Sequence, residues 1–497
     1  MKTLSYDIVI IGSGAGGGTV AKELAPLCKK GVRIALLEWG GRFRDQDNSR
    51  SEVEMAQKYY FESGGVQNTS QNMTFALAKA VGGSTTVYTG TSLVLPDEIL
   101  EKKWAIPGLN SSNLRPRFQK YLRENNVHLL DKALINENNQ LFYNACTKLG
   151  LKPSQFPVNV KNCQGLGTCN LGCAVHAKQG THVVQIPMAE KDGVELVPFC
   201  RVDRIEENQV MATVLPAEHG LSPSPWPCGE YCIRAKKIVL CAGAIHTPAL
   251  MLKSFGPYHQ ALGKYFTCHP ALILVAQHDH EINNTFGHPK SYYCEDFMHS
   301  HSVLLETCMY FPFTLAKNLV GFGSEVDELM SDFNRLQMIL VLIMDHARKE
   351  NGICLDREGR PVVHYRFTRE DICAFVKGIK ESARIFFAAG AKRIHAPASA
   401  KFFIQAEDAP RIDELINEKE FKLGKMSIAS AHLMGGCRMG ENPAAAVTDS
   451  WGRVYGKKDL YVADASLFPN SSGVNPYLTI MALADRVAEA VTQDLRP

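Results

Sequence analysis

A chain of 497 residues is longer than one hydrophobic core usually supports, so at least two domains are expected. Hydrophobic residues make up 45% of the chain and charged residues 21%, a composition that excludes a disordered protein. The formal net charge is only +3, and no cluster of Lys and Arg with interleaved aromatic residues is present, so nucleic acid is not an expected partner.

The apolar runs predict neither a signal peptide nor a membrane-spanning helix. The run at residues 6–11 belongs to the first predicted strand, and residues 338–344 fall far short of the roughly 20 residues that a spanning helix needs. The 15 cysteines follow no disulfide-scaffold pattern and are expected to be mostly reduced. The sequence therefore predicts a protein that is cytoplasmic or peripherally associated with a membrane.

The N-terminal segment predicts a strand, a glycine-rich turn and a helix. YDIVII passes directly into GSGAGG, in which Gly12 permits a tight turn. Gly14, followed by Ala15, lets the backbone approach a pyrophosphate, and Gly17 allows the helix to pack closely on the strand. In this context the motif predicts an adenine dinucleotide site.

Two later segments extend this predicted site. A second buried strand, VRIALLE, ends in Glu38 at the spacing of a carboxylate that accepts the adenosine ribose hydroxyls and repels the 2′-phosphate of NADP. Residues 78–90 hold a second glycine pair with hydroxyl side chains, in which Gly83 and Ser84 are suited to lying along a pyrophosphate or ribityl chain.

Cys163, Cys169 and Cys173 lie in a glycine-rich segment with two histidines nearby. A zinc site, a local disulfide and a tight loop near the active site are the alternatives. The C-x5-C-x3-C spacing lacks the usual C-x2-C knuckle, so the loop is the interpretation adopted and no metal site is predicted.

The middle of the chain alternates between sheet-like and helical patterns. Residues 194–214 predict strands of a small accessory sheet, and residues 236–252 predict a strand, a turn containing Ala242 and a helix beginning near Thr247-Pro248. Residues 266–424 begin with an alternating strand and predict an antiparallel sheet covered by an amphipathic helix at 368–390.

Residues 304–323 are rich in aromatic and aliphatic side chains without a clear helical or strand period. Such a segment can be ordinary core packing or the wall of an apolar cavity, and composition alone leaves both open.

The C-terminal 70 residues hold the candidate chemistry. His432 lies on the glycine-rich turn AHLMGGCRMG, and a strand from Leu460 to Ala463 ends in Asp464. A helix is predicted to begin at Asn475-Pro476, with Asn475 as its N-cap and Pro476 at the first helical position. The positive end of this helix would stabilise an anion, such as a phosphate or an electron-rich reduced ring.

In this order and spacing the motifs resemble the glucose-methanol-choline (GMC) family of FAD-dependent oxidoreductases. The resemblance runs from residue 5 to 493 through GSGAGGG with Glu38, VGGSTT, CAGAIHTPALML, HLMGGCRMG and the closing NPYLTIMALADR. Within the family the chain looks most like the long-chain fatty alcohol oxidase and cholesterol oxidase branches.

The resemblance implies an α/β fold in which a Rossmann-like FAD-binding domain is joined to a discontinuous α+β substrate domain on an antiparallel sheet. The FAD domain would comprise residues 1–100, 190–265 and 425–497. The substrate domain and cap would comprise residues 101–189 and 266–424.

The resemblance also implies the roles of the site residues. His432 would accept the proton of an alcohol while hydride passes from the alcohol carbon to flavin N5, and Asn475 would hold the substrate oxygen. The backbone of Val202 would touch adenine. Where the family has Asn or His, this chain has Tyr88, which leaves covalent attachment of FAD there in doubt. The cofactor residues are then Gly12, Gly14, Ala15, Gly17, Glu38, Gly83, Ser84, Val202, Ala242, Asp464, Asn475 and Pro476.

The expected substrate is a hydrophobic alcohol, such as a long-chain alcohol or a sterol. A sugar or other polar alcohol, a non-redox relative such as a cyanohydrin lyase or a photodecarboxylase, and a flavin-binding protein without turnover remain alternatives. The sequence leaves open whether oxygen, a quinone or another carrier reoxidises the flavin, and it does not give the oligomeric state.

Overall fold

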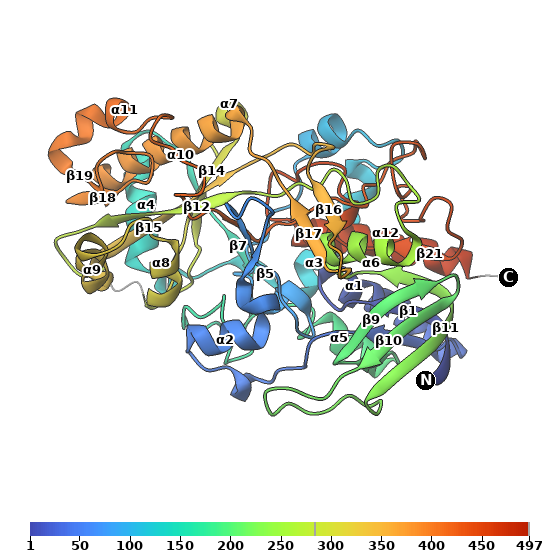
Figure 1. The fold of residues 1–497 in the computed structure, drawn as a ribbon. Coiled ribbons are helices and arrows are strands. Elements are labelled where there is room, and N and C mark those ends of the chain that lie inside the picture. The colour runs from blue at the N-terminus through green and yellow to red at the C-terminus, as the bar shows by residue number, and fades with distance from the viewer. Residues whose placement is uncertain (283–284, 496–497) are drawn as a thin grey trace.

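The computed structural model describes residues 1–282 and 285–495, which form two lobes, each built around a β-sheet (Figure 1). The first sheet has the order β8-β2-β1-β11-β10-β9, with β21 paired to β11. β1 pairs in parallel with β2 and β11, as expected for a dinucleotide-binding core. Its strands are β1 (Lys2–Ile11), β2 (Ile34–Leu37), β8 (Glu195–Val197), β9 (Cys200–Glu206), β10 (Gln209–Val214), β11 (Gly229–Leu240) and β21 (Leu460–Val462).

The prediction of a separate accessory sheet at residues 194–214 is wrong, because its strands belong to this first sheet. β11 pairs with β1 and is long enough to pair with two further strands: residues 229–234 pair with β10, and residues 238–240 pair with β21. β8 joins the opposite edge by pairing in parallel with β2. The sheet therefore continues without a break from its parallel part to its antiparallel part.

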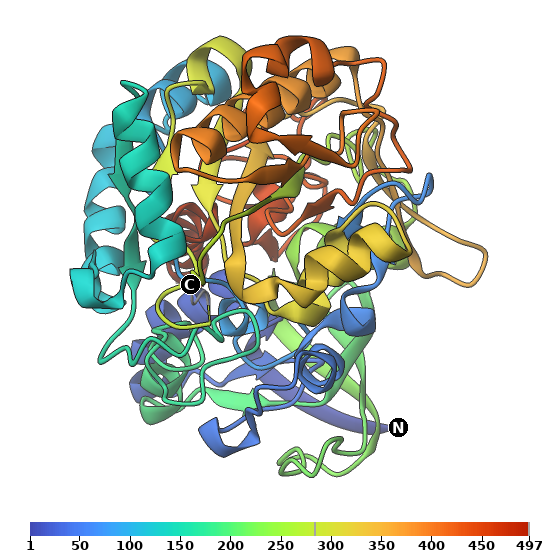
Figure 2. The same cartoon turned by 90° about the vertical axis from the view of Figure 1, so that its left-hand side faces the viewer.

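The second sheet is largely antiparallel, as predicted, and forms the other lobe (Figure 2). Its order is β3-β4-β20-β12-β15-β14-β13-β6, with β18 paired to β12 and β19 paired to β18. The strands are β3 (Val66–Gln67), β4 (Thr74–Phe75), β6 (Pro153–Gln155), β12 (Ala271–Gln277), β13 (Tyr292–Cys294), β14 (Val303–Thr307), β15 (Leu336–Ile343), β18 (Arg393–His395), β19 (Phe403–Gln405) and β20 (Ala429–Ser430). Short pairs are formed by β5 (Val127–Leu129) with β7 (Pro157–Asn159) and by β16 (Gly352–Leu355) with β17 (Pro361–His364).

β3, β4 and β20 come from chain segments that the sequence analysis assigned to the FAD domain. The chain therefore passes between the two lobes several times. The proposed domain boundaries stay a prediction.

The helices cover both lobes. Those of the described chain are α1 (Ala15–Leu24), α2 (Glu52–Tyr59), α3 (Ser111–Glu124), α4 (Glu137–Lys148), α5 (Gln185–Lys191), α6 (Gly243–Phe255), α7 (Met298–His301), α8 (Pro312–Asn318), α9 (Ser324–Ser331), α10 (Arg369–Ala388), α11 (Ile412–Leu415) and α12 (Tyr477–Asp494).

The second sheet is buried on both faces, which explains the unbroken apolar run at residues 338–343 of β15. Side chains alternate along a strand, so one set of β15 residues packs with α10, while Met338, Leu340 and Leu342 pack on the other face with α8 and α9. The helix predicted at 368–390 is confirmed as α10, which Thr368 begins with a capping box to Asp371. The face opposite α10 remains available to line a cavity.

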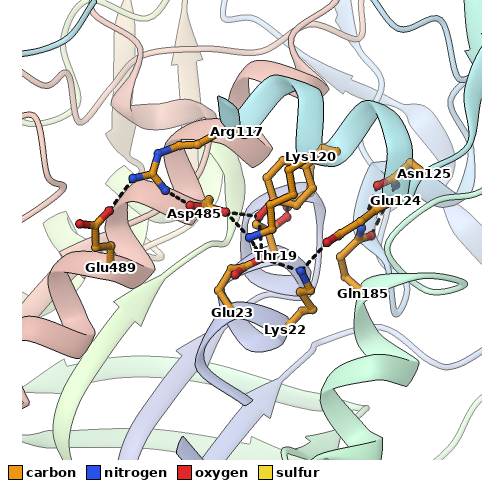
Figure 3. Close-up of polar contacts among 12 residues, drawn as sticks. Thr19, Lys22, Glu23, Arg117, Lys120, Glu124, Asn125, Gln185, Asp485 and Glu489 are labelled. Carbon is orange, nitrogen blue, oxygen red and sulfur yellow. Dashed lines mark hydrogen bonds and ion pairs between the residues drawn. The ribbon is translucent and has the colours of Figure 1, made fainter. Parts of the chain in front are cut away.

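A network of ion pairs joins α1, α3 and α12 in the first lobe (Figure 3). Lys120 on α3 bridges Glu23 on α1, at 2.6 Å, and Asp485 on α12, at 2.7 Å. Arg117 also pairs with Asp485 and reaches the more exposed Glu489 at 2.5 Å. The network fixes the helices that carry the glycine-rich turn and the C-terminal block.

No helix among residues 1–282 and 285–495 has the length and apolar composition needed to cross a bilayer.

Candidate functional site

A cavity of about 830 Å³ is lined by both sheets and contains the sequence motifs from the two ends of the chain. Eleven of the twelve predicted cofactor residues line it, and so does His432. Only Gly17 does not. These lining residues are Gly12, Gly14, Ala15, Glu38, Gly83, Ser84, Val202, Ala242, Asp464, Asn475 and Pro476.

The glycine-rich turn needs its glycines for packing as well as for access. Gly12 has a φ of +96°, and a Cβ there would lie 2.4 Å from the Cys241 carbonyl oxygen. A Cβ on Gly17 would lie 1.8 Å from the Gly12 carbonyl oxygen. Gly17 therefore allows α1 to pack closely against the turn that follows β1, and it does not line the cavity. Gly14 is different, since a Cβ there would meet only Gly83, at 3.8 Å. This open space leaves the N-terminus of α1 accessible.

Two buried carboxylates face the cavity and are held by several donors each. Glu38 accepts hydrogen bonds from the backbone and hydroxyl of Ser13, at 2.9 and 2.7 Å, and from the Gly40 backbone at 2.8 Å. Asp464 accepts from the Thr247 hydroxyl at 2.6 Å and from the Gly243 backbone at 2.8 Å. Burial raises the pKa of both carboxyl groups, while these hydrogen bonds favour the ionised form.

The helix after the Cys241-Ala242 turn begins earlier than predicted. α6 starts at Gly243, not near Thr247-Pro248. The Thr247 hydroxyl is instead turned back to accept from the Ala242 backbone N–H at 3.0 Å while it donates to Asp464. Its side chain therefore ties β11, α6 and the strand end at Asp464 together.

Four polar side chains form a chain of contacts that reaches the cavity through Asn475, His432 and His269. Asn475 Nδ2 lies 3.3 Å from His432 Nε2, and His432 Nδ1 lies 2.9 Å from His269 Nδ1. His269 Nε2 in turn lies 2.8 Å from the Ser471 hydroxyl. The chain brings these groups together from three loops, which precede β12, follow β20 and precede α12.

Asn475 is not the N-cap of the last helix, which corrects the sequence prediction. α12 begins at Tyr477 with Pro476 in the capping position, and no side chain caps it. The Asn475 amide is turned towards His432 instead. The unfilled helix terminus therefore stays free to stabilise negative charge near His432.

Burial keeps both histidines neutral. It lowers the pKa of His432 well below the usual 6.5, and the nearby His269 and Lys290 lower it further. Burial also lowers the pKa of His269 to about 3. A neutral imidazole at His432 can accept a proton at physiological pH.

Comparison with known proteins agrees with this geometry. Residues 6–271 and 350–484 match the N-terminal and C-terminal regions of the GMC oxidoreductase family. The chain belongs to the GMC oxidoreductase family. It is accordingly an FAD-dependent oxidoreductase, as the resemblance implied.

Relatives of this GMC oxidoreductase align with nearly the whole of this chain and with part of their own length. An uncharacterized GMC-type oxidoreductase of Mycobacterium tuberculosis is 27% identical over 97% of this chain and 75% of its own. Long-chain-alcohol oxidase FAO4B of Arabidopsis thaliana is 26% identical over 99% of this chain and 68% of its own.

Solved structures share the fold at lower identity. Pyridoxine 4-oxidase from Mesorbium loti has a TM-score of 0.73 at 16% identity, covering 98% of this chain and 99% of its own. Formate oxidase of Aspergillus oryzae RIB40 has a TM-score of 0.72 at 14% identity, with both chains covered completely.

The cavity of this GMC oxidoreductase has the features that FAD requires. The N-terminus of α1 carries no side-chain cap, so its backbone N–H groups are open to a pyrophosphate beside Gly14. Asn475 also lines the cavity, and its Oδ1 atom is buried without a hydrogen-bond partner among the described residues, which a bound ligand can supply. Tyr88 lines the cavity, where its phenol oxygen accepts from the Asn159 amide.

An apolar part of the cavity wall comes from the second sheet and from the segment that contains α8. It includes Ala271 and Ile273 of β12 and Leu340 and Leu342 of β15. The segment 304–323, whose role the sequence left open, contributes Tyr310 and Phe313 to this wall as well as core residues such as Leu315. Both alternatives for the segment therefore hold, for different residues.

Two features of the cavity were missed by sequence reasoning. His269 is the first residue of a run predicted as a strand, but nothing local shows that this strand end faces the His432 turn. Lys290 lines the cavity and pairs with the fully buried Glu306. A lysine and a glutamate 16 residues apart carry no recognisable spacing signal.

The cysteine-rich segment forms part of the cavity wall through Asn170 and Leu171. Cys163, Cys169 and Cys173 are free thiols. Among the described residues, no group of three or more His, Cys, Asp or Glu side chains is arranged to hold a metal ion.

Proposed function

We propose that the protein oxidises the hydroxyl group of a hydrophobic alcohol, such as a long-chain alcohol or a sterol. The observation that carries the proposal is the arrangement of His432 and Asn475 in a cavity that also has an apolar wall from the second sheet. The relationship to plant long-chain-alcohol oxidases supports the substrate class.

In this proposal the chain's own residues bind the hydroxyl group and accept its proton. Bound FAD supplies the acceptor for the hydride. His432 takes the hydroxyl proton at Nε2, which the 3.3 Å contact with Asn475 holds only loosely. The Asn475 amide holds the substrate oxygen, and the N-terminus of α12 stabilises negative charge nearby. The apolar wall excludes water from the alcohol carbon.

FAD would be held by the glycine-rich turn, Glu38 and Asp464. The α1 N-terminus and Gly14 would receive the pyrophosphate, and Glu38 retains lone pairs for the ribose hydroxyls beside its three protein donors. The backbone at Val202 and the small Ala242 would border the adenine end.

The experiment is anaerobic reduction of the purified holoprotein by a panel of primary alcohols, sterols and sugars. We expect bleaching of the flavin by long-chain alcohols or sterols, and about 10²-fold slower bleaching in His432→Ala. Normal reduction in that variant would remove His432 from the proton transfer. Reduction by sugars alone would assign a polar substrate. No reduction, with cyanohydrin cleavage or blue-light decarboxylation, would assign a non-redox function.

The electron acceptor is tested separately, by comparing aerobic turnover with dye-coupled turnover of the best alcohol. Hydrogen peroxide formation at the full rate of flavin reduction would assign an oxidase, whereas dye dependence would assign a dehydrogenase.

A further inference from the structure

His269 is the side chain that contacts the Nδ1 edge of His432. The contact is built into the backbone, because Thr267 and Met434 exchange both backbone hydrogen bonds at 2.9 Å and Ala271 pairs with Ala429. The two histidines lie between these pairings on neighbouring antiparallel segments. Their rings meet edge to face, with planes at 89°.

In this chain of contacts each hydrogen bond is donated in the same direction, from Asn475 towards Ser471. An amide Nδ2 only donates, so His432 Nε2 accepts from Asn475 and carries no proton. The proton of neutral His432 is therefore on Nδ1, which donates to His269 Nδ1 at 2.9 Å. His269 then carries its proton on Nε2 and donates it to the Ser471 hydroxyl at 2.8 Å.

Burial restricts both the ring position and the protonation state of His269. Its side chain is inaccessible to solvent, and both of its ring nitrogens are already used. Because its pKa is strongly lowered by burial, it stays neutral and keeps one acceptor nitrogen for His432. Without that acceptor, a neutral His432 could place its proton on either nitrogen.

We infer that His269, supported by Ser471, is a positioning residue that holds His432 as the Nδ1–H tautomer and so keeps Nε2 open to the substrate hydroxyl. The inference deepens the proposed function and rests on it for its kinetic consequence. The tautomer itself is a property of the protein without substrate.

The first test reads the tautomer directly in holoprotein labelled with ¹⁵N-histidine. The His432 signals are assigned as those absent from His432→Ala. We expect the Nδ1–H form in the wild type and in His269→Asn, whose amide oxygen lies near the position of the imidazole Nδ1. We expect a substantial Nε2–H fraction in His269→Leu, which offers no acceptor.

The second test measures the rate of flavin reduction at saturating alcohol. His269→Leu should lower this rate by about 10- to 100-fold, the size of effect found when the hydrogen-bond partner that orients a metal-binding histidine is removed, with KM nearly unchanged. His269→Asn should recover most of the loss. The control is His395→Leu, which removes another buried histidine, on β18, whose Nδ1 bonds the Phe402 carbonyl oxygen and which does not line the cavity.

His269→Leu that retains the Nδ1–H form, or His269→Asn as slow as His269→Leu, would overturn the inference. If His269→Leu does not fold with FAD bound, Ser471→Ala takes its place, since it removes the acceptor of His269 Nε2–H. Two results together would then count against the inference. The first is an unchanged His432 tautomer in Ser471→Ala, and the second is flavin reduction in His269→Asn as slow as in His432→Ala. Failure of every alcohol to reduce the wild-type flavin rejects the proposed function but leaves the tautomer test intact.

Discussion

Burial sets the protonation state of His432, and this gives a pH dependence with a definite sign. An exposed histidine would gain a proton, and lose its function as a base, as the pH falls through about 6.5. The pKa of His432 lies well below that value because the site is buried and because His269 and Lys290 disfavour a second charge. The base form should therefore persist on the acid side of neutrality.

We expect kcat/KM for flavin reduction to show no inflection near pH 6.5. The measurement is anaerobic reduction by the best alcohol from pH 8 to the lowest pH at which the protein stays folded, because kcat/KM reports on groups of the free enzyme. A tenfold loss per pH unit beginning at pH 6.5, and absent from His432→Ala, would show that His432 titrates normally.

Asn475 is the residue for which a structural role and a functional role are most clearly separated. Because it does not cap α12, removing its amide should leave the helix intact. Asn475→Ala should keep FAD and nearly the wild-type Tm while flavin reduction slows by at least tenfold, about the effect of one lost hydrogen bond to a charged group. Visible absorbance measures the bound FAD, thermal unfolding measures the Tm, and stopped-flow absorbance measures the rate of flavin reduction. A large fall in Tm with a normal rate would return Asn475 to a structural role.

At the scale of single residues, the sequence predicts those residues of the candidate site that belong to local motifs. Gly12, Glu38, His432 and Asn475 are each recognisable from a turn, a strand end or a helix start. His269 is not, because its position opposite His432 depends on how β12 pairs with β20. Residues whose role comes from tertiary pairing leave no signal in a short window of sequence.

At the level of secondary structure, an ion-pair network joins α1, α3 and α12, which also share the hydrophobic core. Asp485 is its most buried acid, with 8% of its side chain exposed, and it receives Arg117, Lys120 and the Tyr121 hydroxyl. Breaking a buried pair by removing one partner costs about 3–5 kcal/mol, since the remaining charges stay buried without compensation.

Asp485→Asn should therefore lower the Tm by several degrees, while Glu489→Gln should change it little. Glu489 contacts the same Arg117, but 43% of its side chain is exposed, so water can replace it. Thermal unfolding followed by circular dichroism compares the two variants directly. Equal effects would mean that burial does not decide the strength of this network.

Element boundaries show where sequence patterns lose precision. Proline suggested the starts of α6 and α12, yet Pro248 lies inside α6 and Pro476 lies just before α12. In both cases a side chain next to the proline has a tertiary partner, Asp464 for Thr247 and His432 for Asn475. Thr247 and Asn475 therefore make tertiary hydrogen bonds that local helix preference does not reveal.

At the scale of the whole molecule, the cavity is where the two lobes meet. Gly12 and Glu38 belong to the first sheet, whereas Ala271 and Leu340 belong to the second, and all four line the same cavity. The sequence could predict each lobe from its own pattern, parallel strands with a glycine turn in one and antiparallel strands in the other. It could not give the long-range pairing of β3, β4 and β20 that joins them.

A ligand that fills a cavity shared by two lobes should stabilise both of them, so removal of FAD should lower the Tm of the whole protein. Binding to the folded state alone adds about 2.7 kcal/mol when free ligand is 100 times Kd, and the gain grows with the logarithm of ligand concentration. We expect apoprotein to unfold several degrees earlier than holoprotein, and added FAD to restore the Tm in a dose-dependent way. Gly12→Ala is the matched comparison, because its Cβ would collide with the Cys241 carbonyl oxygen at the wall of the cavity. If FAD shifts the Tm of the wild type and not of Gly12→Ala, the stabilisation comes through this cavity; equal shifts would place the binding elsewhere.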